Sequence, residues 1–70
     1  MRPTGYFDDS GRPIRDGDLV RAIIQRQIII GEVCEGERDW YVHNVKPGGW
    51  APDIWHLDSV TILRRYRDDD

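Results

Sequence analysis

The sequence predicts an all-β fold: a single small SH3-like barrel, or a strongly bent antiparallel sheet, with one short helical turn near the C-terminus. Short runs of β-branched and aromatic residues alternate with Gly, Pro and Asp, a pattern typical of small β proteins. Apolar residues show almost no helical spacing. The chain has 70 residues, which is enough for one domain, residues 1–70, with one small core.

The first 17 residues are expected to form an extended entry segment that contains two turns. The first turn signal is Asp8-Asp9-Ser10-Gly11, and the second is Asp16-Gly17, which opens directly onto an apolar run. Asp8 and Asp9 are adjacent carboxylates in a loop without an apolar setting. We therefore expect both to be solvated rather than to work as an acid–base pair.

Four runs of β-favouring residues follow the entry segment. The polar break Gln25-Arg26-Gln27 contains no glycine, which predicts a type I turn or a longer loop between the first two runs. Gly31 lies inside the second run, where a glycine marks a β-bulge or a close backbone approach. The strands are expected at Leu19–Ile24, Gln27–Cys34, Trp40–Asn44 and Val60–Leu63.

Turn residues dominate the segment between the third strand and the last one. Lys46-Pro47-Gly48-Gly49 predicts a turn, after which Trp50-Ala51 is a candidate short strand. Pro52–Leu57 predicts a single helical turn, with Asp53 placed to cap it. Residues 64–70 are expected to form a polar tail.

The buried side chains are expected to come mainly from the four strands and the helical turn. On the third strand, Trp40, Val42 and Asn44 share one face because side chains alternate along a strand. The predicted core comprises Leu19, Val20, Ile23, Ile28, Ile30, Val33, Trp40, Val42, Leu57, Val60 and Ile62.

Few residues carry metal or nucleophilic chemistry. Cys34 is the single cysteine, so no internal disulfide forms, and its place in a strand predicts a buried thiol. His43 and His56 show no metal-ligand spacing and are expected to face solvent or to be hydrogen-bonded. We therefore expect no metal, no cofactor and no enzymatic activity.

The opening of the chain resembles that of the YopX-like proteins, which are small phage and prophage products. The resemblance covers the N-terminal quarter of the chain, and the Gly-Asn-Ile-Tyr-like closing strand of that family is absent. It implies a small β protein of phage origin and names no reaction. The matching positions are Thr4, Gly5, Asp8, Gly11, Ile14, Gly17, Asp18 and Val20.

The expected function is protein binding, by a phage-encoded accessory protein that docks on a host transcription or defence complex and modulates or inhibits it. The acidic middle of the chain suits a basic, nucleic-acid-binding surface on the partner, and solubility alone explains the same charge equally well. Trp50 and Trp55 stand in loops, either as binding anchors or as lids over the core. The expected binding residues are Trp50, Trp55, Glu32, Glu35, Glu37, Asp39 and Asp53.

Two other functions fit parts of the sequence. Arg64, Arg65 and Arg67 surround Tyr66, a basic and aromatic run that suits a nucleic-acid-binding small barrel. The net charge of −3 argues against nonspecific nucleic-acid binding. The remaining alternative is an oligomer that traps a small nucleotide ligand between its subunits.

The sequence contains no apolar run of membrane-spanning length, and its start lacks the apolar segment of a signal peptide. Together with the free thiol, these features predict a cytoplasmic protein, and the YopX-like resemblance implies that the cytoplasm is that of a bacterial host.

Overall fold

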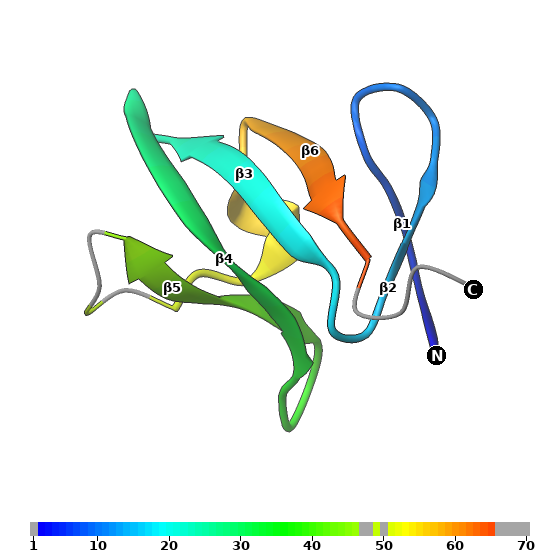
Figure 1. Ribbon diagram of the computed structural model, residues 1–70. Coiled ribbons are helices and arrows are strands. Elements are labelled where there is room, and N and C mark those ends of the chain that lie inside the picture. Colours follow the sequence, from blue (N-terminus) through cyan, green and yellow to red (C-terminus); the bar gives the residue numbers. More distant parts are fainter. Residues whose placement is uncertain (1, 47–48, 50, 66–70) are drawn as a thin grey trace.

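The computed structural model describes residues 2–46, 49 and 51–65, which fold as two antiparallel sheets and one 3₁₀ turn (Figure 1). One sheet is the hairpin of β1 and β2, and the other has the strand order β5-β4-β3-β6. The all-β class and the four predicted strands are confirmed. The elements are β1 (Pro3–Phe7), β2 (Pro13–Arg15), β3 (Leu19–Ile24), β4 (Gln27–Glu35), β5 (Trp40–Lys46), η1 (Ile54–His56) and β6 (Ser59–Arg64).

The N-terminal segment is a paired hairpin rather than a single extended entry, because β1 pairs antiparallel with β2. The predicted turn at residues 8–11 closes this hairpin, and the backbone N–H of Gly11 donates to the carbonyl oxygen of Asp8 at 2.9 Å. At the second turn Gly17 has a φ of +89°, which glycine adopts without steric strain. The turn residues thus predicted both reversals of the chain, while the pairing between the two short strands was missed.

The core lies on the inner face of the four-stranded sheet, the face that η1 covers from behind in Figure 1. Five of the predicted core residues are buried there, as are five others that were not predicted. Trp40 and Leu57 pack against this core while staying partly exposed. The buried apolar residues are Ile14, Val20, Ala22, Ile24, Ile29, Val33, Val42, Ile54, Val60 and Ile62.

Four predicted core residues, all on β3 and β4, lie outside the core, whereas Val20 and Val33 on the same strands are buried as predicted. The stretches 22–24 and 28–30 are continuously apolar, and alternation cannot tell which side chains of such a run point inward. In the structure Ile29 is fully buried, whereas its neighbour Ile28 is 59% exposed. The residues on the opposite face or at its rim are Leu19, Ile23, Ile28 and Ile30.

The turn between β3 and β4 is tighter than predicted. Ile24 pairs directly with Gln27, which leaves a two-residue loop. Gln25 and Arg26 have φ values of +51° and +66°, the left-handed conformation at both central positions that a type I′ hairpin turn requires. This conformation matches the twist of the flanking strands, and here it is adopted without glycine.

Gly31 behaves as predicted, with both a bulge and a close backbone approach. The β4–β5 register shifts between Ile30 and Gly31. A Cβ atom on Gly31 would lie 2.2 Å from the carbonyl oxygen of His43 and 2.7 Å from Cγ1 of Val42. Only a residue without a side chain allows β4 and β5 to approach this closely.

The predicted helical turn is present as η1, which buries Ile54. Asp53 makes no side-chain capping hydrogen bond, so the predicted cap is wrong. Ala51 belongs to no strand, and the chain instead meets β5 through an isolated bridge between Tyr41 and Asp53. No helix in the described part of the chain has the length and apolarity needed to cross a membrane. The predicted turn at Pro47 and Gly48, Trp50, and tail residues 66–70 with Arg67 lie outside the described residues.

The loop between β1 and β2 covers the free edge of β6, using aspartate side chains in place of a further strand. The Asp8 carboxylate accepts hydrogen bonds from the backbone N–H groups of Arg12 at 2.9 Å and Ile62 at 3.2 Å. Asp9 donates its backbone N–H to the carbonyl oxygen of Val60 at 2.9 Å. Asp8 is 5% exposed, so its predicted solvation is wrong. The β1–β2 loop therefore blocks the edge of β6, at which a strand of another chain could otherwise pair.

Candidate functional site

A shallow groove of about 300 Å³ runs between β1 and the loop that joins β4 to β5. It contains three of the predicted binding acids, two aromatic rings and two glycines. The lining residues are Thr4, Gly5, Tyr6, Glu35, Gly36, Glu37, Arg38, Asp39 and Trp40.

Two glycines allow the walls of this groove to take their shape. Gly5 has a φ of +86° in the middle of β1, a conformation that side chains strongly disfavour. Gly36 donates its backbone N–H to the carbonyl oxygen of Asp39 at 2.9 Å. A Cβ atom on Gly36 would lie 2.7 Å from that same oxygen, so the loop closes tightly only with glycine there.

Asp39 ties the two walls of the groove together. The Tyr6 hydroxyl donates to Oδ2 of Asp39 at 2.7 Å, and the backbone N–H of Trp40 donates to Oδ1 at 2.8 Å. The hydrogen bond to Asp39 raises the pKa of the Tyr6 phenol, with further increases from burial and from the negative charges of Asp39 and Asp53. The phenol therefore stays protonated and works as a hydrogen-bond donor.

Arg2, a residue just before β1, already places a cation at this groove. Its guanidinium lies over the ring of Trp40, 5.4 Å from the ring centroid. The same group forms an ion pair with Glu35 on the opposite wall. The groove thus holds a guanidinium between an aromatic face and a carboxylate, an arrangement that favours arginine over lysine.

The structure gathers some of the predicted binding acids and separates others. Glu35, Glu37 and Asp39 line the groove, and Asp53 is near enough to raise the pKa of Tyr6 by its charge. Glu32 instead lies on the outer face of β4, opposite His43 in the β4–β5 register. The acidic middle of the sequence therefore divides between two surfaces.

Trp55 is on the surface of η1 and is 58% exposed. Its ring packs against that of His56 with the centroids 3.7 Å apart and the planes tilted by 51°. Trp55 is therefore mostly exposed rather than buried as a lid over the core. Its predicted companion, Trp50, lies outside the described residues.

The basic run was expected after the last strand, but it begins within β6, whose last residue is Arg64, and its arginines have different environments. Nη1 of Arg65 lies 3.1 Å from Oδ2 of buried Asp18, and its Nη2 donates to the carbonyl oxygen of Pro13 at 2.9 Å. Arg65 therefore ties the end of the main sheet to the β1–β2 hairpin. Arg64 is exposed, and Arg67 lies outside the described residues.

Cys34 is half-buried on the outer side of β4, so the prediction of a buried thiol was wrong. Burial nevertheless raises the pKa of its thiol, and the negative charges of Glu32 and Asp16 add to this, which keeps the sulfur protonated and weakly nucleophilic. Within the described residues, no three His, Cys, Asp or Glu side chains come together as metal ligands would.

Sequence reasoning missed Arg2 and Tyr6 as parts of this site. Both lie in or beside β1, which contacts the β4–β5 loop only in the folded protein. The hydrogen bond from Tyr6 to Asp39, for example, joins residues that are 33 positions apart in the sequence. Thr4 and Gly5 stood out in the sequence only as positions of the YopX-like resemblance, and nothing local indicated which loop this segment would face. Comparisons with protein-family models, curated proteins and solved structures found no match for this chain.

Proposed function

We propose that this protein is a non-enzymatic binding module that docks on a partner protein and accepts a basic side chain of that partner in the acidic groove. The observation that supports this most directly is the position of Arg2, whose guanidinium contacts Trp40 and Glu35. An arginine of a partner would make the same two contacts after displacing Arg2, whose side chain belongs to the N-terminal end of the chain and is 63% exposed.

The carboxylates of the groove determine the strength of such an interaction and the rate at which it forms. Exposed ion pairs contribute only about 0–1 kcal/mol each, and a cation over an exposed aromatic ring about 0.5–1 kcal/mol. The groove therefore favours a basic segment that makes several such contacts at once. The main effect of the acids is expected on the association rate, which complementary charge increases and salt decreases.

The proposed partner is a host protein with a basic, nucleic-acid-binding surface, and the proposed setting is a phage accessory protein in the cytoplasm of a bacterial host. The YopX-like opening supports phage origin. The order of β3, β4 and β5, followed by η1 and by a last strand that pairs with β3, supports the finer proposal of an SH3-like barrel.

The test is affinity capture from a bacterial lysate, followed by binding kinetics with the captured partner immobilised, at low and high salt. Glu35→Gln and Glu37→Gln together should slow association severalfold at low salt and have little effect at high salt. Glu32→Gln is the matched control, because it removes one acid from the opposite, outer face.

Trp55→Ala tests the exposed tryptophan separately and should increase the dissociation rate if Trp55 is an anchor. Equal association rates for the groove double variant and for Glu32→Gln would contradict the proposed role of the groove. Faster dissociation for Trp55→Ala alone would move the docking site to η1.

A further inference from the structure

The outer face of the four-stranded sheet is a second surface, on the opposite side from the core. Because side chains alternate along a strand, the burial of Val20 and Ala22 on β3 leaves Leu19, Arg21 and Ile23 pointing outward. On β4 the same alternation turns Ile28, Ile30 and Glu32 outward. The strand register places these two sets side by side, with Ile23 opposite Ile28 and Arg21 opposite Ile30.

Aliphatic side chains are concentrated on this outer face. Ile28 is 59% exposed and Leu63, on β6, is 48% exposed. Leu19, Ile23 and Ile30 are partly exposed beside them. Single exposed aliphatic residues are ordinary, but a contiguous group on adjacent strands marks an interaction surface. We call these five residues the outer aliphatic patch.

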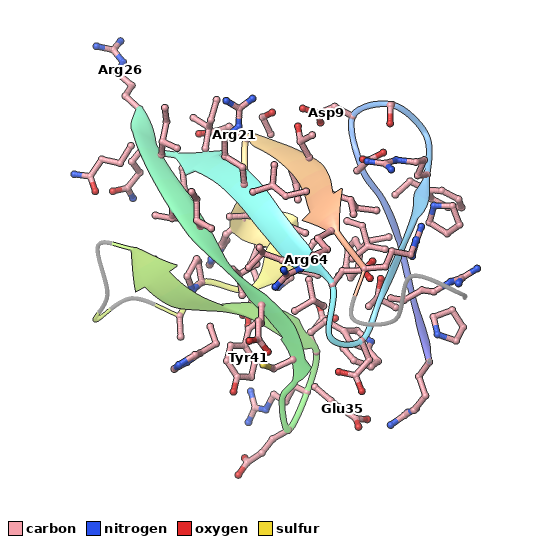
Figure 2. The ribbon with its side chains drawn as sticks, in the orientation of Figure 1. Asp9, Arg21, Arg26, Glu35, Tyr41 and Arg64 are labelled. Atoms are coloured by element: carbon pink, nitrogen blue, oxygen red, sulfur yellow. The ribbon has the colours of Figure 1, made fainter. Side chains whose placement is uncertain are left out.

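Arg21 stands at the middle of the outer aliphatic patch. It lies opposite Ile30 on one side and Thr61 on the other, with Leu19 and Ile23 as its neighbours along β3. Its side chain is exposed, and it forms no ion pair within the part of the chain that the structure describes. Figure 2 shows Arg21 and Arg64 along this region and Arg26 at the tip of the β3–β4 turn, with Glu35 at the opposite end of β4.

We propose that the outer aliphatic patch binds an acidic amphipathic segment of a protein partner, whose apolar side chains cover the isoleucines and whose carboxylate pairs with Arg21. Arg21 lies among the isoleucines, whereas the acids near this face, Glu32 and Asp16, lie close to Cys34, toward the other end of β4. The surface is therefore complementary in charge to an acidic segment. It is distinct from the acidic groove, so this inference does not depend on the proposed function.

The charge distribution favours this occupant over two others. In a two-fold symmetric dimer centred on the patch, the Arg21 side chains of the two copies would face each other, which costs energy because like charges meet. Single-stranded nucleic acid gains most of its base contacts by stacking on aromatic rings, and the centre of this patch is aliphatic.

The test uses isotope-labelled protein and a synthetic helical peptide of about four turns, with leucines three and four residues apart on one face and glutamates elsewhere. A second peptide keeps the leucines and replaces every glutamate by lysine. Isoleucine methyl signals report the site, because Ile28 and Ile30 belong to the patch while fully buried Ile14 lies in the core.

We expect the glutamate peptide to shift the methyl signals of Ile28 and Ile30 and to bind at least about tenfold more tightly than the lysine peptide, a difference of about 1.4 kcal/mol. Arg21→Glu and Ile28→Thr should each weaken binding severalfold. Phe7→Ser is the matched control, because Phe7 is equally exposed, at 63%, but lies on β1 outside the patch. It should bind like the parent protein.

Other outcomes would overturn the proposal. Equal binding of both peptides, or unchanged affinity of Arg21→Glu, would exclude recognition of an acidic segment. Binding of oligothymidylate at this face in place of the peptide would identify a nucleic-acid surface. Concentration-dependent dimerisation that Ile28→Thr abolishes in sedimentation equilibrium would identify a second copy as the occupant.

Discussion

Replacing Asp8 by asparagine is the sharpest test of how this small fold is held together. Asp8 lies in the loop that covers the edge of β6, with its side chain fully shielded from solvent. Its Oδ1 accepts hydrogen bonds from the backbone N–H of Ser10 at 3.0 Å, the Ser10 hydroxyl at 2.9 Å and the backbone N–H of Arg12 at 2.9 Å. Its Oδ2 faces the backbone N–H of Ile62 at 3.2 Å and the Arg12 guanidinium at 3.3 Å.

Asparagine keeps one acceptor oxygen and replaces the other by an NH₂ group. If the oxygen stays with Ser10 and Arg12, the NH₂ group faces two further donors, the N–H of Ile62 and the Arg12 guanidinium. Hydrogen bonds to charged groups contribute about 1.5–3 kcal/mol each. We therefore expect a loss of about 3 kcal/mol in the free energy of unfolding, which is a large part of the roughly 3.5–10 kcal/mol available to a domain of 70 residues.

The pH dependence of this loss identifies its cause. Burial alone would raise the pKa of Asp8, but the hydrogen bonds from Arg12, Ile62 and Ser10 outweigh it and hold the pKa well below its usual range. A carboxyl whose folded pKa lies below its unfolded value of about 3.9 stabilises the fold above that pH and loses this contribution as the pH falls further. The difference between the parent protein and Asp8→Asn should therefore be largest near neutral pH and shrink below about pH 4.

The assay is urea unfolding followed by circular dichroism across this pH range. Asp9→Asn is the control, because among the described residues the exposed Asp9 side chain accepts only a hydrogen bond from the Ser59 hydroxyl and a long one of 3.3 Å from the N–H of Val60. It should cost less than about 1 kcal/mol. Equal losses for the two variants, or a loss for Asp8→Asn that stays constant with pH, would refute the role assigned to the Asp8 carboxylate.

Three further changes test the core, the β4–β5 contact and the thiol. Val42→Ala removes two methyl groups from a fully buried site and should cost about 2–4 kcal/mol, whereas Ile28→Ala on the exposed face should cost less than about 1 kcal/mol in thermal or urea unfolding. Gly31→Ala should destabilise the protein by about 1–3 kcal/mol or more, because the new Cβ would lie 2.2 Å from the carbonyl oxygen of His43. Cys34 should react with iodoacetamide more slowly at neutral pH in the folded protein than in urea, since its thiol pKa is raised, and equal rates would contradict this.

The positions that carry the YopX-like resemblance have structural roles in the described fold. Thr4 donates its hydroxyl to the carbonyl oxygen of Ile14 at 2.8 Å, and Ile14 is fully buried. Asp8 closes the edge of β6, and Asp18 pairs with Arg65. Most residues of the resemblance therefore build the hairpin and fasten it to the main sheet, while Thr4 and Gly5 also line the groove, together with residues outside the resemblance such as Trp40.

The sequence by itself determined the positions of the four strands of the main sheet and of the two N-terminal turns. β-Branched runs between Gly, Pro and Asp specify these through local sterics and backbone preferences, and the position of β3 was predicted to the residue. Gly31 was likewise recognisable, because only a missing side chain explains a glycine inside so apolar a run. Such features depend on a few neighbouring residues, all of which are visible along the chain.

Only the tertiary structure decided which face of each strand is buried and which distant groups meet. Continuous apolar runs carry no alternation, so it was the packing of the whole core that selected Ile29 over Ile28 as the buried residue. The burial of Asp8 and the contact of Tyr6 with Asp39 join segments 54 and 33 residues apart. Their energies depend on contacts that form only after the chain has closed, and local sequence therefore cannot reveal them.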